Sequence, residues 1–381
     1  MPEKALKKKH QTGREMENKK RVGIVFGGKS AEHEISLLSG ANVLRALDRN
    51  KFIPVPLGID KEGSWFIAKG FEVEKDVAPD TLIESTAQDM ERGEWKGVFT
   101  PFEIDKLAEK VDVVFPALHG ANGEDGAFQG LMEMLGIPYG GCGVLASALC
   151  MDKAMAKEVF RVKGIPTCRY FLVHAADLDA KENEIIEKSE EEFSYPVFVK
   201  PANGGSSLGI TKALNRDELK DALKLAAEYD RRILIEEAID AREIETAVIG
   251  NKEIKVSTCG EIAAADDHRY YDYDAKYSDN SGTLLVIPAD IPDNIMEEIR
   301  ELAKRAYRET VCEGFARVDT FWDRKTGRIL INEINTIPGL TKYSLFQRLW
   351  EDEGISFTDL ITEILELGYE RYNDQNSRKK I

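Results

Sequence analysis

Residues 315–336 read FARVDTFWDRKTGRILINEINT, and this stretch decides how the chain folds. Its two halves alternate like strands and are joined by a polar turn that contains glycine, so the pattern predicts an antiparallel hairpin. Arg317 and Asp319 are two residues apart on the first strand, as are Glu333 and Asn335 on the second. Side chains two apart project from the same face of a strand. The hairpin therefore presents one arginine and three oxygen donors on a shared surface.

The three oxygen-containing side chains are possible metal ligands, and no cysteine or histidine accompanies them. Such a ligand set suits Mg²⁺ bound to a nucleotide phosphate. Six apolar residues would anchor the hairpin in a core: Phe315, Val318, Phe321, Ile329, Ile331 and Ile334. A solvated strand face with charges paired across it would show the same pattern. The rest of the chain has to separate these two interpretations.

The overall composition predicts two or three globular domains, because the chain has 381 residues and is 43% hydrophobic. A net charge of −16 argues against a general nucleic-acid or anionic-membrane surface. The five cysteines are scattered without a CxxC pair, which supports neither a disulfide framework nor a zinc site and fits a reducing cytoplasm. No apolar run approaches the roughly 18 to 20 residues of a membrane span, and the N-terminus lacks an apolar signal core.

The folded part is expected to begin at Arg21, after a disordered, lysine- and glutamate-rich extension at residues 1–20. A short strand at 22–26 runs into GGKS and then a helical pattern, with Ser30 predicted as the N-cap and Glu32 in the first turn. A carboxylate there would repel a phosphate, so this helix start suits an amine better. An ordinary, well-capped strand–helix unit would look the same.

Two further strands, at 52–59 and 111–116, continue a parallel α/β pattern. The second of them ends in a glycine-dense loop that contains His119, and open α/β sheets bind ligands at such strand ends. A loop histidine whose hydrogen bonds are all satisfied within the fold is an equally good interpretation.

The composition changes near residue 140 to a glycine-rich and then helical segment that contains Lys153, which predicts a domain boundary. Further on, YPVFVKPANGGSSLG predicts a strand that ends at Lys200, followed by a loop able to fold over a triphosphate. A simple Gly/Ser hairpin is the alternative. Residues 270–282 form a polar aromatic stretch that is too long for a turn, so we expect a lid. A last helix is predicted over about 358–369, followed by a frayed polar tail from 373.

Eight motifs occur in one order: GGKSAEHEIS, HGANGEDG, MDK, VKPANGGSSLG, EEAI, YYDYDAKY, ARVDT and NEINTIPGLTKYS. Over residues 21–369 the chain resembles the D-alanine–D-alanine ligase family of the ATP-grasp superfamily. The resemblance implies an α/β fold in which an N-terminal parallel α/β domain precedes a two-part ATP-grasp fold. The implied parts are a substrate-binding domain at 21–140, a central ATP-grasp lid domain at 141–238, a catalytic ATP-grasp domain at 239–370, and a polar tail at 371–381.

The resemblance also implies the residues of the site. ATP would be bound by Lys153, Lys200, Ser206, Ser207, Glu236, Glu237, Ala238, Ile239, Glu243, Lys276 and Asn332. Two Mg²⁺ ions, or Mn²⁺ in their place, would be held by Asp319, Glu333 and Asn335. The substrates would meet Glu32, His119, Arg317, Gly339, Ser344 and Leu345, and the catalytic groups would be Glu32, Ser206, Arg317, Tyr277, Lys276 and His119.

The implied reaction joins two D-alanine molecules through an acylphosphate, at the expense of ATP, for peptidoglycan precursors. Tyr277 favours an amine as the nucleophile, whereas Glu237 stands where the family often has lysine. We expect a cytoplasmic homodimer that binds neither nucleic acid nor membrane, with residues 71–99 serving dimer packing. The alternatives are a depsipeptide or mixed D-amino-acid ligase on the same fold, and a nucleotide-binding regulator without catalysis.

Overall fold

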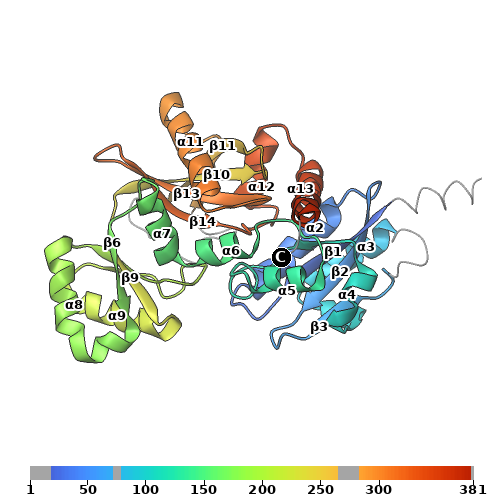
Figure 1. Ribbon diagram of the computed structural model, residues 1–381, viewed down its shortest axis with the longest axis horizontal. Coiled ribbons are helices and arrows are strands. Elements are labelled where there is room, and N and C mark those ends of the chain that lie inside the picture. The colour runs from blue at the N-terminus through green and yellow to red at the C-terminus, as the bar shows by residue number, and fades with distance from the viewer. Residues whose placement is uncertain (1–18, 72–78, 265–282, 379–381) are drawn as a thin grey trace, which may run out of the picture.

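A computed structural model describes residues 19–71, 79–264 and 283–378. These residues form three sheets, one after another along the sequence, and each has its own helices (Figure 1). The described segments also include the short 3-10 helices η1 (Trp95–Val98), η2 (Ile104–Lys106) and η3 (Ala175–Asp177). None of the helices in the described ranges is both long and apolar enough to cross a membrane.

The first sheet has three parallel strands with an antiparallel extension on one side. Its strands lie in the order β4 (Phe99–Pro101), β3 (Trp65–Ala68), β2 (Phe52–Ile59), β1 (Lys20–Gly27) and β5 (Val113–Pro116). Apart from Lys20 and Arg21 at the start of β1, the parallel strands are apolar, because helices cover both faces of the sheet. One face packs on α2 (His33–Ala46) and α3 (Asp80–Glu91), and the other on α4 (Leu107–Lys110) and α5 (Ala127–Leu135). The predicted parallel α/β pattern is confirmed, although β5 begins two residues later than expected.

The insertion between β3 and β5 belongs to this first core. Trp95 is buried and meets the rings of Phe26 and Phe99 edge to face, with centroids 5.6 and 5.2 Å away. Aromatic pairs in this geometry stabilise a core beyond their buried area. The expected role of this insertion in a homodimer stays a prediction.

The second sheet is antiparallel and smaller. Its strands lie in the order β6 (Tyr170–His174), β9 (Arg232–Glu237), β7 (Val197–Pro201) and β8 (Thr211–Ala213), and α8 (Leu178–Glu192) and α9 (Arg216–Tyr229) pack against it. Two helices, α6 (Val144–Met151) and α7 (Lys153–Val162), connect it to the first sheet. Asp152 caps α7, because its Oδ1 accepts a hydrogen bond from the Met155 amide at 3.0 Å. Lys153 is thereby fixed as the first residue of α7.

The third sheet contains the predicted hairpin. Its strands lie in the order β12 (Thr283–Val286), β11 (Lys255–Ala264), β10 (Ala241–Ile249), β13 (Phe315–Asp323) and β14 (Ile329–Asn335). One face packs on α11 (Asp293–Glu309) and the other on α12 (Leu345–Asp352). In the hairpin Arg317 lies opposite Asn335, and Asp319 lies opposite Glu333. The predicted shared surface is therefore confirmed.

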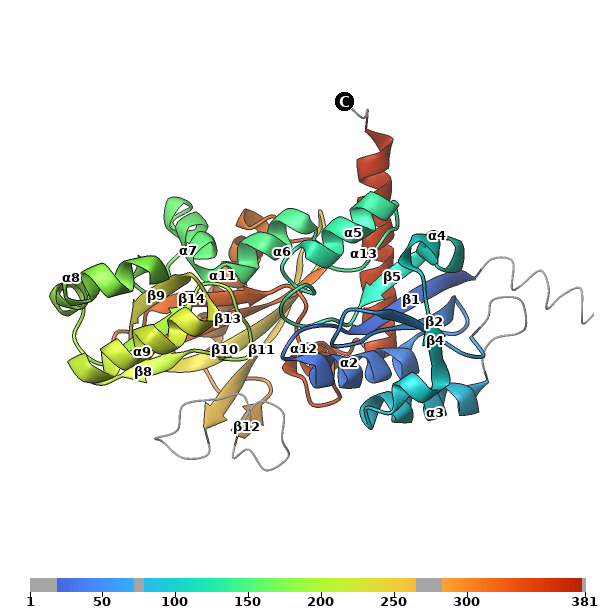
Figure 2. The same cartoon turned by 90° about the horizontal axis from the view of Figure 1, so that it is seen from below.

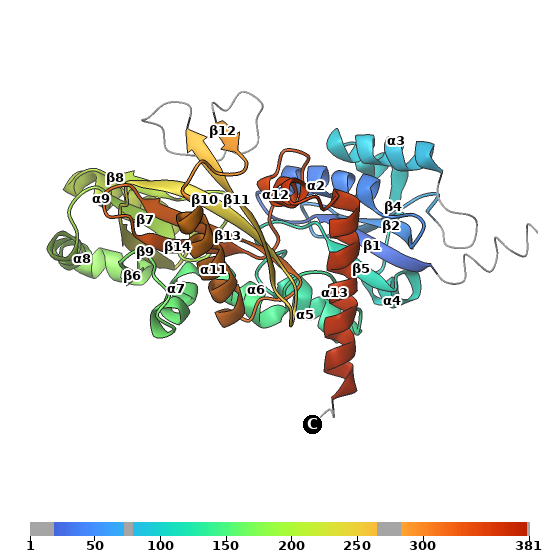
Figure 3. The ribbon, with the colours of Figure 1, turned by 90° about the horizontal axis from the view of Figure 1, so that it is seen from above.

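The last helix, α13 (Phe357–Ser377), packs against α2 and β5 of the first sheet, as Figures 2 and 3 show from opposite sides. The expectation of a frayed tail from residue 373 is wrong, because this helix continues to Ser377. Arg371 explains the extra turns. It is buried and donates hydrogen bonds to the carbonyls of Tyr139, at 3.0 Å, and Gly141.

Candidate active site

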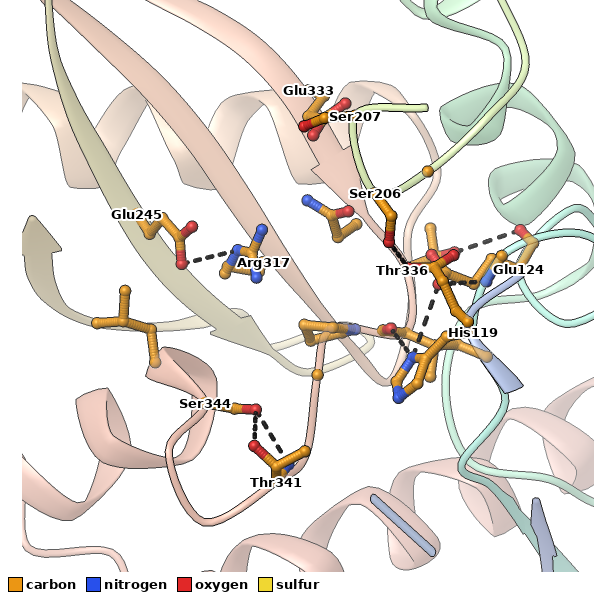
Figure 4. A pocket seen from close by; sticks show the side chains of 18 of the residues that line it. His119, Glu124, Ser206, Ser207, Glu245, Arg317, Glu333, Thr336, Thr341 and Ser344 are labelled. Carbon is orange, nitrogen blue, oxygen red and sulfur yellow. Dashed lines mark hydrogen bonds and ion pairs between the residues drawn. The ribbon is translucent and has the colours of Figure 1, made fainter. Parts of the chain in front are cut away.

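A cavity of about 480 Å³ lies where the three sheets come together. Eleven of the residues predicted for the site line it: Glu32, His119, Lys153, Ser206, Ser207, Arg317, Glu333, Asn335, Gly339, Ser344 and Leu345. Figure 4 shows Ser207 near Glu333 at one end, and Ser344 with Thr341 at the other, beside the start of α12. Residues more than 300 positions apart in the sequence thus share one cavity.

Glu32 is the anionic group that the first sheet contributes. The expectation that Ser30 caps α2 is wrong: the helix begins at His33, Glu32 occupies the N-cap position, and the Ser30 hydroxyl accepts a hydrogen bond from the Glu32 amide. The Glu32 side chain turns away from its helix instead and accepts a hydrogen bond from the Ser206 hydroxyl. Gly120 makes room for it, because a Cβ at that position would collide with Glu32 Oε2, and its φ of +70° favours glycine.

His119 is buried, and both of its ring nitrogens have partners. Nδ1 lies 3.1 Å from the carbonyl of Ile337, and Nε2 lies 2.8 Å from the Ser39 hydroxyl. A carbonyl can only accept, so Nδ1 carries a hydrogen, and in the neutral ring Nε2 accepts from Ser39. Burial alone would lower the pKa of His119, but the carboxylates of Glu124 and Glu32 raise it above its ordinary value. His119 therefore joins the first sheet to the segment after β14.

Lys153 and the loop after β7 form the part of the cavity suited to phosphate. Lys153 Nζ donates to the Gly204 carbonyl at 2.7 Å and lies 3.2 Å from Glu333 Oε2. Ser206 and Ser207 both have left-handed backbone angles, with φ of 51° and 59°. Successive backbone amides in a turn can point toward one side, which is a common way to bind anions.

A buried ion-pair cluster lies behind this loop. Glu236 is 1% exposed, and its two oxygens lie 2.7 Å from Lys200 Nζ and 3.2 Å from Lys157 Nζ. Burial alone would raise the pKa of Glu236, but attraction by the two lysines lowers it to about 2. Lys157 was not predicted from the sequence, although it lies four residues after Lys153 and so on the same face of α7.

The hairpin surface combines one cation with several oxygen donors. Arg317 binds both oxygens of Asp319, each at 2.7 Å, and its Nε lies 2.9 Å from Glu245 Oε2. Asn335 Nδ2 donates to Asp319 at 2.9 Å. Glu245 on β10 is a second residue that the sequence analysis missed.

The residues present fit Mg²⁺, because a carboxylate from each strand and one amide oxygen meet at adjacent positions of the sheet. In the ranges that the structure describes, no group of three or more histidine, cysteine, aspartate or glutamate side chains is arranged to hold a metal. A site on the hairpin would therefore need the Asn335 amide and oxygens from a bound phosphate.

The start of α12 forms the opposite end of the cavity. The Ser344 hydroxyl lies 2.9 Å from the Thr341 hydroxyl and accepts a hydrogen bond from the Thr341 amide at 3.0 Å. Ser344 is the N-cap residue, yet its side chain makes no capping bond to the helix. The first amides of α12, from Leu345 onward, lack intrahelical partners and suit a carboxylate.

The other predicted residues within the described ranges, Lys200, Glu236 and Asp319 among them, are not part of the lining of this cavity. Glu237 pairs with Arg169, with Oε2 2.9 Å from Nε; Ala238 and Ile239 lie between β9 and β10; and Glu243 lies opposite Phe321. Asn332 is the bulged residue of β14, since Thr320 pairs with Ile331 and Asp319 with Glu333. Lys276 and Tyr277 lie outside the described residues.

Three sheets around one cavity, with a lysine paired to a carboxylate of the hairpin, are the arrangement of the ATP-grasp ligases, and the solved structures similar to this chain have that fold. Two family models match the chain, "D-ala D-ala ligase N-terminus" at residues 21–142 and "D-ala D-ala ligase C-terminus" at residues 159–366. The chain therefore belongs to the D-alanine–D-alanine ligase family, whose reaction is the ATP-dependent joining of D-alanines for peptidoglycan synthesis.

Individual relatives agree with the family models. The D-alanine–D-alanine ligase of Thermoanaerobacter sp. (strain X514) is 45% identical over 364 residues, which cover 94% of this chain and 98% of the relative. The corresponding ligase of Caldicellulosiruptor bescii is 45% identical over 372 residues, covering 95% and 98%.

Two solved structures show the same agreement. The VanG D-Ala:D-Ser ligase from Enterococcus faecalis has a TM-score of 0.79 at 34% identity, covering 92% of this chain and 99% of that one. The D-alanine–D-alanine ligase from Coxiella burnetii has a TM-score of 0.78 at 30% identity, covering 94% and 98%.

Proposed function

We propose that this protein joins two D-alanines, that the cavity of the three sheets is its active site, and that it works in the cytoplasm. The observation that carries the proposal is the meeting, in one cavity, of the hydrogen-bonded Glu32–Ser206 pair with Lys153, Arg317 and Glu333. The five cysteines are all buried and free, which supports a reducing compartment.

The first D-alanine would bind with its ammonium on Glu32. That carboxylate is 8% exposed and is positioned by the Ser206 hydroxyl, so the ammonium would replace little water and gain a strong charge-assisted hydrogen bond. The opposite end of the amino acid would then point toward Arg317 and the phosphate part of the cavity.

A carboxylate is a poor acyl donor, so the first step would transfer the γ-phosphoryl group of ATP to the carboxylate of the first D-alanine. This transfer requires cations around the phosphoryl oxygens. Lys153 and Lys200 would hold the phosphates, and Lys276 would reach the transferred group from the lid. Adenine would contact Glu236, Glu237, Ala238 and Ile239, with Asn332, Ser206 and Ser207 as further nucleotide contacts, and Glu243 would bind the ribose.

Asp319, Glu333 and Asn335 are the residues that would hold two Mg²⁺ ions, or Mn²⁺. When bound, the ions supply positive charge to the phosphate oxygens. Their binding requires Asp319 to share its interaction with Arg317, and Glu333 to share its interaction with Lys153, because both carboxylates already carry these partners.

In the second step the amine of another D-alanine would attack the acylphosphate and displace phosphate. Arg317 and the Gly339 amide would stabilise the tetrahedral oxyanion, and loss of one such donor typically costs about 10²- to 10³-fold in rate. Ser344 and the Leu345 amide would receive the carboxylate of the second D-alanine. The lid with Tyr277 would exclude water from the acylphosphate.

The choice of second substrate is the main alternative, because a similar solved structure is a D-Ala:D-Ser ligase. The test is phosphate release from ATP and Mg²⁺ with D-alanine, L-alanine, D-alanine plus D-serine, or D-alanine plus D-lactate, with products identified by mass. D-Alanine alone should suffice and give the dipeptide. Release that requires D-serine or D-lactate would assign the protein to a sister specificity, and no release with any of them would leave a nucleotide-binding protein without this catalysis.

A further inference from the structure

Arg348, on α12, lines the cavity and is half-buried. Within the part of the chain that the structure describes, it makes no hydrogen bond and no ion pair. The other cations deep in the cavity are engaged, since Lys153 lies against Glu333, and Arg317 binds Asp319 and Glu245. Arg348 is therefore a positive charge on the substrate cavity that the mechanism above does not use.

The charge of the cavity makes this arginine significant. Five carboxylates line it: Glu32, Glu91, Glu124, Glu245 and Glu333. A substrate that arrives with its own carboxylate is repelled by this lining unless a cation without a fixed partner offsets the repulsion. Arg348 has the required charge and position.

The packing of α12 fixes the side on which Arg348 lies. Phe346, Leu349 and Trp350 are buried in the core, and a Cβ on Gly260 of β11 would come within 2.6 Å of Leu345, so helix and sheet are in close contact. From α2, Asn42 Nδ2 donates to Gln347 Oε1 at 2.9 Å. With these contacts made, the helix cannot rotate, and Ser344, Leu345 and Arg348 face the cavity together.

The direction of the side chain brings its charge to the start of the helix. Side chains on an α-helix lean toward the N-terminus and cover the turn before their own Cα. Four residues of helix rise about 6 Å, which is within the reach of an arginine side chain. The guanidinium can therefore meet a carboxylate bound at Ser344 and the Leu345 amide.

We propose that Arg348 positions the carboxylate of the second D-amino acid at the N-terminus of α12 and makes the enzyme select acceptors with a free carboxylate. This inference rests on the proposed function. A guanidinium binds a carboxylate through two parallel hydrogen bonds, which fixes its orientation as well as its charge. Arg348 is thus a positioning residue, and the amine of the acceptor is aimed at the acylphosphate through it.

The test lets two acceptors compete for the same acylphosphate. Wild-type enzyme, Arg348→Gln and Arg348→Lys receive ATP, Mg²⁺ and a fixed mixture of D-alanine and D-alaninamide, and the two products are counted by mass spectrometry. D-Alaninamide has no carboxylate to phosphorylate, so it can act only as the acceptor. We expect the ratio of dipeptide to dipeptide amide to fall about tenfold in Arg348→Gln and to recover in part in Arg348→Lys.

A merely structural role for Arg348 would lower both products together and leave their ratio unchanged, and that result would overturn the proposal. Arg308→Gln is the matched control, because Arg308 is an exposed helical arginine on α11 away from this cavity. As a second measurement, the KM for D-alanine should rise about tenfold in Arg348→Gln while kcat and the KM for ATP stay within twofold. An unchanged KM would also overturn it, whereas failure of the wild type to make dipeptide from D-alanine would overturn the proposed function instead.

Discussion

Replacing Glu236 with glutamine should destabilise the second sheet by about 3 kcal/mol at pH 7. Glutamine keeps the size of the side chain but leaves Lys157 and Lys200 beside a buried neutral amide. The two lysines lower the pKa of Glu236 from 4.5 to about 2, and each pKa unit corresponds to about 1.36 kcal/mol. Removing one partner from a buried ion pair costs about 3 to 5 kcal/mol in general, which agrees with this value.

The stabilisation by Glu236 should depend on pH in a defined direction. The folded-state pKa of Glu236 lies below the unfolded value, so its contribution to stability is fully present above 4.5 and is lost as the pH falls through about 2. The difference in stability between wild type and Glu236→Gln should therefore be largest near neutral pH and should shrink steadily below pH 4.5.

Tryptophan fluorescence would miss this change, because no tryptophan belongs to the second sheet; they are Trp65, Trp95, Trp322 and Trp350. Hydrogen exchange read by mass spectrometry on peptides from β7 and β9 reports the opening of that sheet directly. The control is Glu237→Gln, since the partner of Glu237, Arg169, is 64% exposed, and ion pairs that water screens contribute less than about 1 kcal/mol. Equal protection of β9 in wild type and Glu236→Gln would refute the reasoning.

Three other substitutions test separate parts of the molecule. Gly120→Ala places a Cβ against Glu32 at a left-handed φ, so we expect the free energy of unfolding in urea to fall by about 1 to 2 kcal/mol and the KM for D-alanine to rise. ATP binding, measured by calorimetry, should be unaffected, and weakened ATP binding would contradict this prediction. Glu333→Gln removes an anionic donor from the hairpin surface and should abolish phosphate release while circular dichroism stays unchanged, whereas near-normal turnover would remove Glu333 from the ligand set. Arg371→Met removes the bonds to Tyr139 and Gly141 and should cost about 2 kcal/mol of unfolding free energy, measured as a lower thermal midpoint; an unchanged midpoint would show that these bonds do not hold α13.

The hairpin shows what strand alternation alone can and cannot predict. A period of two correctly placed Arg317, Asp319, Glu333 and Asn335 on one face. The same period would put Ile331 on that polar face as well, yet Ile331 is fully buried in the core. The bulge at residue 332 resolves the conflict. One extra residue in β14 moves the side chains that precede it to the opposite face of the sheet. Nothing in the local pattern marks that position.

The ion-pair partners of the buried charges are harder to predict from the sequence than the hairpin. The sequence indicated Lys200 and Glu236 because each ends or nearly ends an apolar strand, but Lys157 looks like any lysine on an amphipathic helix. Its role follows only from the packing of α7 against the second sheet, which brings its Nζ to Glu236 and, at 2.9 Å, to the Thr167 hydroxyl. Tertiary contacts of this kind depend on the relative position of whole elements, and periodicity does not encode that.

The loop after β7 and the proposed binding site for the first D-alanine share a single carboxylate, that of Glu32. Left-handed angles at two successive non-glycine residues, Ser206 and Ser207, are unfavourable by about 1 kcal/mol or more each. The hydrogen bond from Ser206 to Glu32 and the bond from Lys153 to Gly204 offset this cost and hold the loop over the cavity. An ammonium on Glu32 would bind the same carboxylate that accepts the hydrogen bond from Ser206, so occupation of the first site should change the stability of the phosphate loop.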